Sequence, residues 1–151
     1  MVANSTDQAL DRLSLRSHLS EMARLPRWLQ SLASRHDIPD NVQFAIDLCL
    51  EEAVSNVIRH GYAGAGDRSV TVLFAMPRSR YFEFVVDDEA PHFNPLTVPA
   101  VEAVNLEQTI CVGGQGIRLL RQFADSVEYE PTPGGNRLRL GFSASGSGRA
   151  K

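Results

Sequence analysis

The sequence predicts an α+β fold, an α/β two-layer sandwich in which helices cover one face of a mostly antiparallel mixed sheet. The first observation behind this prediction is the hydrophobic periodicity, which gives the order β α α β β α β β along the chain. The second is the length of 151 residues, which suits a single domain with one core. We expect this domain to span residues 10–142, between a flexible start at 1–9 and a flexible Gly/Ser-rich tail at 143–151.

Composition and charge exclude several classes of protein. With 43% hydrophobic and 22% charged residues, the chain fits neither a disordered nor a fibrous class. The net charge of -3 and the lack of a basic block argue against direct nucleic-acid binding through phosphates. No apolar run approaches the ~20 residues that cross a bilayer, and residues 1–8 lack the basic segment followed by an apolar one that is typical of a leader. We therefore expect a cytoplasmic protein with no membrane partner. Cys49 and Cys111 lack CxxC spacing and are expected to be buried thiols.

Two helices are expected in the first half of the chain, after a strand near residues 10–19. The first covers about 20–36, where Pro26 lies either in the first turn or at a kink. The second begins with Asp40 as its N-cap and ends before Gly61. One arc of this second helix faces the core with Val42, Ile46, Cys49, Leu50, Ala53 and Val57.

The second half of the chain contains a predicted hairpin, a long connection and a final helix–strand–strand unit. The expected strands are 69–76, 80–87, 126–130 and 137–142, and the expected helix is 116–124. Between them, residues 87–115 form a Pro-containing connection with at most a short helix at 101–106. Connections of this length are usually functional or disordered, and we expect a functional one.

Polar residues on the second helix form the first candidate site. Glu52 and Asn56 are four residues apart and project together at the edge of the apolar arc. Glu51 points about 100° away and is expected to be an ordinary solvated carboxylate. A carboxylate beside apolar surface needs a partner, so a structural bond from Glu52 to a neighbouring loop is the alternative interpretation.

Two further segments carry possible chemistry. Gly113-Gly114-Gln115-Gly116 opens a helix, where free N–H groups and the helix dipole could hold phosphate, although a simple flexible turn is equally compatible with it. No GxxxxGK[ST] motif is present, which excludes the common P-loop. Asp88 ends a predicted strand, where its carboxylate could accept a hydrogen from a purine amino group or cap the turn.

The three segments together are similar to the sequence boxes of one ATPase superfamily. Glu52-Ala53-Val54-Ser55-Asn56, continuing to Tyr62, resembles the N box, residues 88–95 resemble the G1 box, and residues 113–117 resemble the G2 box. Their order and spacing over residues 40–142 resemble the GHKL ATPase superfamily, most closely its anti-sigma factor serine/threonine kinase branch. The resemblance implies a Bergerat-type ATP-binding fold.

The resemblance also implies roles for particular residues. Asn56 would bind the Mg²⁺ that bridges the phosphates of ATP, and Glu52 would be the base that activates the attacking hydroxyl or water. Asp88 would bond the adenine amino group, and the backbone of Gly114 and Gly116 would line the triphosphate. The remaining positions matched to cofactor binding are Ala90, Gly113 and Ile117.

The sequence departs from the family pattern at the G1 box and in the lid. Ala90 stands in place of the G1 glycine and His92 in place of a small residue or proline, so the turn beneath the adenine differs. Residues 93–112 contain no Lys or Arg, although lids of this family can place a basic residue near the γ-phosphate. Arg118 or Arg121 on the next helix could take that place, but helix geometry directs at least one of them into solvent.

The leading hypothesis for function is therefore a kinase that uses ATP and Mg²⁺, phosphorylates Ser or Thr on a small STAS-type anti-sigma-factor antagonist, and sequesters a sigma factor. Such a transferase would regulate transcription by switching partners. The second hypothesis is a nucleotide-dependent binding module of the same fold without kinase activity, favoured by Ala90, His92 and the uncharged lid. A catalytic fragment of a histidine kinase is a third. The oligomeric state stays open, with a homodimer as one option.

Overall fold

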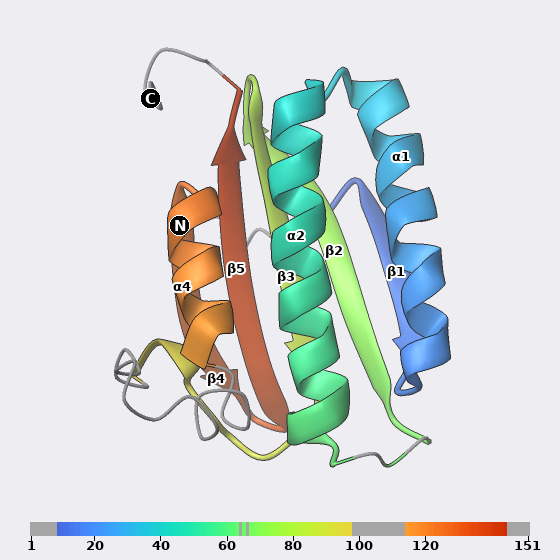
Figure 1. Cartoon of the computed structure of the whole chain (residues 1–151), viewed down its shortest axis with the longest axis vertical. Coiled ribbons are helices and arrows are strands. Elements are labelled where there is room, and N and C mark those ends of the chain that lie inside the picture. Colours follow the sequence, from blue (N-terminus) through green and yellow to red (C-terminus); the bar gives the residue numbers. More distant parts are fainter. Residues whose placement is uncertain (1–8, 64, 66, 98–113, 145–151) are drawn as a thin grey trace.

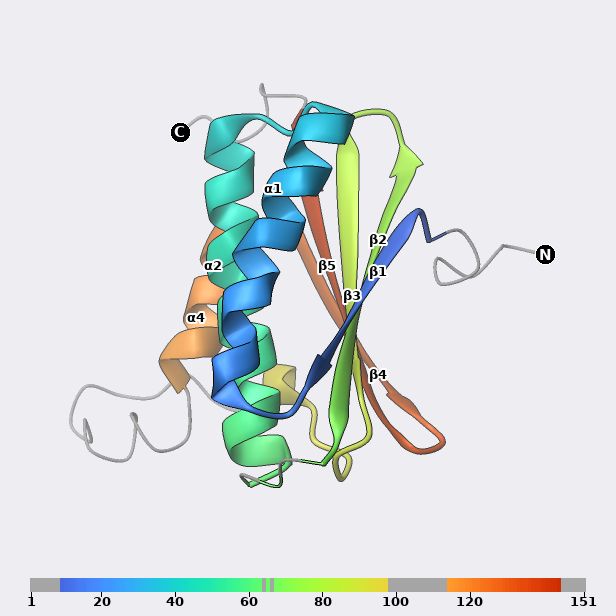
Figure 2. The same ribbon diagram turned by 90° about the vertical axis from the view of Figure 1, so that its right-hand side faces the viewer.

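A computed structural model describes residues 9–63, 65, 67–97 and 114–144. One five-stranded sheet with the order β1-β2-β3-β5-β4 is antiparallel at every described strand pair. Its strands are β1 (Asp11–Arg16), β2 (Ser69–Arg78), β3 (Tyr81–Asp88), β4 (Ser126–Thr132) and β5 (Gly135–Ser143). The helices α1 (Arg24–His36), α2 (Asp40–Asn56) and α4 (Gly114–Phe123) cover one face of the sheet (Figures 1 and 2). The predicted two-layer fold and its element order are confirmed.

The core lies between the two layers, because alternate side chains of each strand point toward the helices. On β2 and β3 these positions hold Phe74, Phe82 and Phe84, all at most 1% exposed. Burial of a side chain of this size contributes about 1.5–3 kcal/mol. The Trp28 ring of α1 packs edge-on against Phe84, with the ring centroids 6.0 Å apart, so the helix layer is anchored on the aromatic centre of the sheet.

Helix α1 begins later than the periodicity predicts. Residues Leu19–Ala23 form a separate 3-10 turn, η2, and the α-helix starts at Arg24. Pro26 therefore lies in the first turn, where its missing N–H requires no acceptor, and the alternative of a kink is not realised. The helix ends at His36, and the left-handed backbone of Asp37 (φ 57°) lets the N–H of the following Ile38 bond the carbonyl of Ala33 at 3.1 Å.

Helix α2 differs from its prediction at both ends. It starts at Asp40, but Pro39 occupies the N-cap position and no side chain caps the helix, so the prediction of Asp40 as N-cap is wrong. Asp40 instead lies in the first turn, where a negative charge suits the helix dipole. The helical run continues as a π-helical turn, η3 (Val57–Gly61), and so includes Gly61, one residue beyond the predicted end.

The π turn changes which side chain enters the core. The N–H of Tyr62 bonds the carbonyl of Val57 at 2.8 Å, five residues back, which widens the turn relative to the 3.6-residue period. Ile58 is consequently buried at 2% exposure, while Val57, the residue predicted for the core, is only partly buried. Val57 is thereby left at the edge of a cavity described below.

The last strand extends beyond the expected end of the domain at residue 142. Strand β5 continues to Ser143, and Ala144 is 7% exposed. The N–H of Ala144 bonds the carbonyl of Arg80 at 2.8 Å, and the Arg80 guanidinium donates back to the carbonyl of Ala144 at 2.8 Å. The hairpin turn between β2 and β3 thus holds the end of β5.

Several expectations lie outside the described residues: those for Cys111, Gly113, the short helix at 101–106, and most of both chain ends. Cys49, by contrast, is fully buried as predicted, and burial raises the pKa of its thiol to about 12.

Within the described ranges, no helix combines the length and apolar character that crossing a membrane requires.

Candidate nucleotide-binding site

A cavity of about 430 Å³ lies between α2, α4 and the adjoining ends of β3, β4 and β5. This volume falls in the range typical of small-molecule sites. Apolar side chains make up much of its wall: Ala53, Val57, Val86, Ala90, Ile117, Leu120 and Leu138. Polar side chains reach it at a few points: Asn56, His60, Asp88, His92, Tyr129 and Asn136. An apolar slot with few polar groups is suited to a flat, partly polar ring system.

Asp88 is the carboxylate in this wall, at the last position of β3. Its Oδ1 accepts the N–H of Ala90 at 2.8 Å and an amide hydrogen from Asn136 at 2.9 Å. Within the described part of the chain, the other oxygen, Oδ2, has no hydrogen-bond partner. Burial raises the pKa of Asp88, and the two donors counteract part of that rise. One oxygen therefore caps the turn, as one of the two sequence interpretations predicts, while the residue also lines the cavity.

Close approach of β5 places the residues around Asp88. Gly135 starts β5, and a Cβ atom on it would lie 1.8 Å from the carbonyl oxygen of Asp88, which no side chain allows. The adjacent Gly134 has nothing within 4 Å of such a Cβ. Both glycines lie at the turn between β4 and β5, but only Gly135 is required for the approach of β5 to β3.

Ala90, which stands in place of the G1 glycine, packs against a glycine of the N box segment. Ala90 is 3% exposed, and a Cβ on Gly61 would lie 3.1 Å from the Ala90 methyl carbon. The methyl group therefore occupies space that Gly61 leaves open at the end of η3. Ala90 contributes to the apolar wall of the cavity.

Tyr62 joins the N box segment to the G1 segment, a role that sequence reasoning did not assign to it. Its hydroxyl donates to the carbonyl of Ser69 at 2.7 Å and accepts the N–H of Glu89 at 2.7 Å. Burial raises the pKa of Tyr62, which keeps the hydroxyl protonated as a donor. The guanidinium of Arg68 lies over its ring, 5.5 Å from the centroid. The turn after Asp88 is thus fixed to the end of the helix that carries Asn56.

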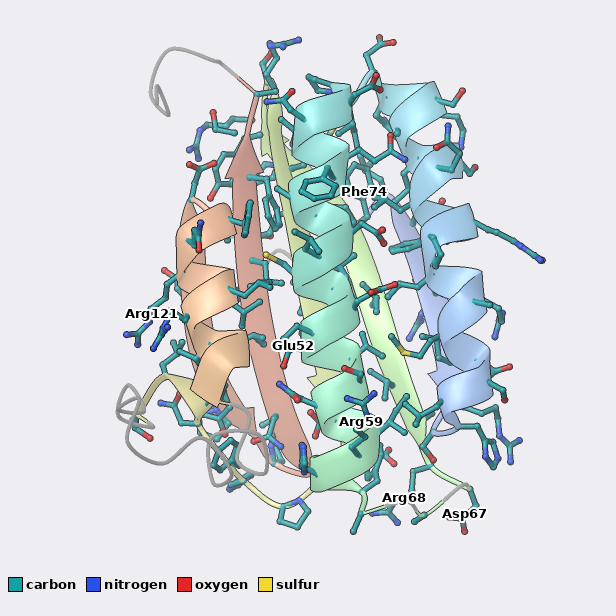
Figure 3. All side chains as sticks on the ribbon, in the orientation of Figure 1. Glu52, Arg59, Asp67, Arg68, Phe74 and Arg121 are labelled. Atoms are coloured by element: carbon teal, nitrogen blue, oxygen red, sulfur yellow. The ribbon has the colours of Figure 1, made fainter. Side chains whose placement is uncertain are left out.

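Asn56 and Glu52 project from α2 as predicted, although only Asn56 lines the cavity. Glu52 is partly buried and extends from α2 on the side that faces α4 (Figure 3). Among the described residues the Glu52 carboxylate has no hydrogen-bond partner, and the connection at 98–113, to which it could bond in the alternative interpretation, lies outside them. Glu51 is exposed, as expected for a solvated carboxylate.

The G2 segment contributes the first turn of α4. The helix begins at Gly114, two residues before the predicted start, and Ile117 reaches the cavity wall. Arg121 points away from α2 (Figure 3), and its guanidinium donates to the carbonyl of Leu96 at 3.0 Å. Arg118 is exposed. Among the described residues that line the cavity, none is Lys or Arg, and the histidines His60 and His92 are the basic side chains present.

His92 lines the cavity and connects the altered G1 turn to the end of β4. Its Nε2 lies 2.8 Å from the carbonyl oxygen of Thr132, the last residue of β4. The next residue, Phe93, is 59% exposed, while its backbone N–H bonds Asn136 at 2.9 Å. The altered G1 turn is therefore an ordered structure with contacts to β4 and β5.

Comparison with known proteins connects this geometry to one family. The curated serine/threonine-protein kinase BtrW of Bordetella bronchiseptica is 25% identical over 115 residues, which cover 75% of this chain and 79% of that protein. A structure of the RsbU and RsbW domains of Rv1364c from Mycobacterium tuberculosis matches 88% of this chain with a TM-score of 0.62 and 14% identity. The histidine kinase domain of a blue-light activated histidine kinase from Erythrobacter litoralis matches 82% with a TM-score of 0.52 and 13% identity.

This chain spans 32% of the first of those structures and 59% of the second, so the structural likeness concerns the fold. The resemblance to the GHKL ATPase superfamily is confirmed by a family match over residues 15–142, and the similarity to a serine/threonine-protein kinase agrees with the kinase branch. The chain belongs to the family of histidine kinase-like ATPase domains.

Proposed function

We propose that this protein binds ATP with Mg²⁺ in the cavity and transfers the γ-phosphoryl group to a Ser or Thr of a protein substrate. The observation that carries the proposal is the presence of a partly buried carboxylate, Asp88, and an amide, Asn56, in the lining of one largely apolar cavity. Membership of the ATPase-domain family and the similarity to a serine/threonine kinase support it.

Each polar residue has a task suited to its chemistry. Asp88 accepts the amino hydrogen of adenine through the oxygen that the turn does not use. Asn56 offers an amide oxygen, a ligand type that Mg²⁺ accepts, and a Mg²⁺ bound mainly through phosphates and water needs few protein ligands. The N–H groups in the first turn of α4, at Gly114 and Gly116, lie where a helix attracts phosphate.

Glu52 is the proposed general base. It takes a proton from the substrate hydroxyl as that oxygen attacks the γ-phosphorus, the bond to the β,γ-bridging oxygen breaks and ADP leaves. Apart from this proton transfer, the reaction depends on positioning and on neutralising charge. Bound Mg²⁺ would supply part of that neutralisation. Glu52 lies on the side of α2 that faces α4, one helical turn before Asn56 in the cavity wall (Figure 3).

The partners in this proposal are a small STAS-type anti-sigma-factor antagonist, as the phosphate acceptor, and a sigma factor. The support is the similarity to a serine/threonine kinase and to a structure that includes an RsbW domain. The alternative is a nucleotide-dependent binding module, which the lack of Lys and Arg among the described cavity-lining residues favours.

Phosphotransfer by three versions of the full chain tests the proposal. Glu52→Gln removes basicity but keeps the size of the side chain, so turnover should fall by ~10²–10⁴ while ATP still binds. Glu51→Gln, on the exposed side of the same helix, should retain full activity. The assay measures phosphate incorporated into candidate antagonists from labelled ATP and Mg²⁺.

Loss of activity in Glu51→Gln, or full activity in Glu52→Gln, would contradict the assignment of the base. If the wild-type chain binds ATP but transfers phosphate to no candidate, the binding module becomes the better description.

A further inference from the structure

Asn136 is one of two buried polar side chains in the part of the chain that the structure describes, and it lies outside all three sequence boxes. It occupies the second position of β5, paired in register with Asp88 at the end of β3. Its side chain is buried, with 8% exposure, and yet it forms part of the cavity wall. Its place beside Asp88 raises the question of what it does for a bound base.

The side chain of Asn136 is saturated with hydrogen bonds. Its Nδ2 donates to Asp88 Oδ1 at 2.9 Å and lies 3.2 Å from the carbonyl oxygen of Ala90 and 3.1 Å from that of Pro91. Its Oδ1 accepts the N–H of Phe93 at 2.9 Å and the hydroxyl of Tyr129. A carboxamide offers two N–H donors and two lone pairs, so no capacity is left for a ligand.

The saturation of Asn136 determines what the sheet side of the cavity can offer. The polar side chains that reach the cavity from β3, β4 and β5 are Asp88, Tyr129 and Asn136. The Tyr129 hydroxyl donates to Asn136, and the Asn136 side chain bonds five residues, which lie at the end of β3, in the turn after it and in β4. What remains is Oδ2 of Asp88, which only accepts hydrogen bonds while the carboxylate is ionised.

We infer that Asn136 is the positioning residue that sets nucleobase specificity, because it holds Oδ1 of Asp88 toward the protein and leaves Oδ2 as the acceptor for a base. This inference rests on the proposed ATP-binding function. A cavity wall that offers only hydrogen-bond acceptors suits a base with an exocyclic amino group at position 6, as in adenine. A base with a keto oxygen there, such as hypoxanthine, places two acceptors against each other and is rejected.

Electrostatics supports the same role. Burial raises the pKa of Asp88, and the hydrogen bond from Asn136 is the largest influence that counteracts the rise. Without that donor, the carboxyl group would be protonated more readily and could donate to a keto oxygen. Loss of Asn136 should therefore reduce discrimination between bases more than it reduces affinity for the triphosphate.

The test compares ATP with inosine 5′-triphosphate, whose base carries a keto group at position 6. Both are titrated, with Mg²⁺, into the full chain by calorimetry. The wild-type protein should prefer ATP by about 10-fold or more, the order expected for a hydrogen bond to a charged group. Asn136→Ala should bring this ratio close to one, and Asn136→Ser, which keeps a hydroxyl donor, should retain part of it.

Arg137→Gln is the matched control. Arg137 is the next residue of β5 and points to the opposite face of the sheet, where its guanidinium bonds Asp87 at 2.7 Å. This variant should lower the melting temperature but keep the wild-type preference for ATP. If Asn136→Ala does not fold, the ratio measured for Asn136→Ser decides.

The outcomes separate this inference from the proposed function. A wild-type chain that binds neither nucleotide contradicts both. A wild-type preference for ATP that the Asn136 variants keep, or that Arg137→Gln loses equally, overturns the role of Asn136 alone. Variants that lose both nucleotides to the same extent also overturn it, because they reveal a general structural role.

Discussion

Asp47 and Glu51 lie one turn apart on α2, yet their carboxylates have different surroundings. Glu51 is exposed, whereas Oδ1 of Asp47 is buried and has no hydrogen-bond partner within the described ranges. Burial raises the pKa of Asp47. The sequence pattern predicted the exposure of Glu51, but it could not reveal the burial of Asp47, because that depends on how closely the neighbouring elements pack.

Asp47→Asn should stabilise the protein at neutral pH. Because the pKa of Asp47 is higher in the folded protein than in the unfolded chain, the ionised carboxylate lowers the free energy of unfolding at pH values above that pKa. As the pH falls through it, the folded wild type takes up the proton and recovers stability. The melting temperature of the variant should thus exceed that of the wild type at pH 7, by a margin that shrinks on acidification.

Glu51→Gln is the reference for this measurement, since its carboxylate is in solvent and its melting curve should follow the wild type at each pH. A gap between Asp47→Asn and wild type that stays constant from pH 7 to pH 4 would show that ionisation of Asp47 has no part in stability.

At the scale of elements, the sequence predicted the type and order of helices and strands but not their ends. Strong periodicity identified α2, whereas the π turn at Val57–Gly61 and the 3-10 turn at Leu19–Ala23 carry no periodic signal of their own. The pairing of β3 with β5 was likewise outside the reach of local patterns, because these strands are separated by α4 and β4 along the chain.

The close approach of β5 to β3 predicts that alanine substitution at two adjacent glycines has different effects on stability. Gly135→Ala would place a methyl group 1.8 Å from the Asp88 carbonyl oxygen, so the backbone of one strand must move. We expect a loss of about 1–3 kcal/mol in the free energy of unfolding, as for overpacked sites, together with weaker nucleotide binding. Urea denaturation of the variant and the wild type measures this loss.

Gly134→Ala provides the comparison, because nothing lies within 4 Å of the added methyl. Its unfolding free energy should stay within ~0.5 kcal/mol of the wild type. Equal losses for the two substitutions would mean that the turn, and not the contact with Asp88, determines the requirement for glycine.

For the molecule as a whole, segments that are far apart in the sequence meet at one cavity. Asn56 from α2, Asp88 from β3 and Ile117 from α4 all line it, as their places in the three boxes predicted. Asn136, Tyr62 and Gly135 were not predicted as site residues. Their contribution comes from contacts with residues 27 to 48 positions away, which become visible only once the strands are paired.

The central claim is that this cavity binds an adenine nucleotide through Asp88, and a calorimetric titration with ATP and Mg²⁺ tests it most directly. The wild-type chain should bind one ATP, and Asp88→Asn, which replaces one acceptor oxygen by a donor, should bind it about 10-fold more weakly or worse. Absence of binding to the wild type, or equal affinity of the two proteins for ATP, would contradict the account.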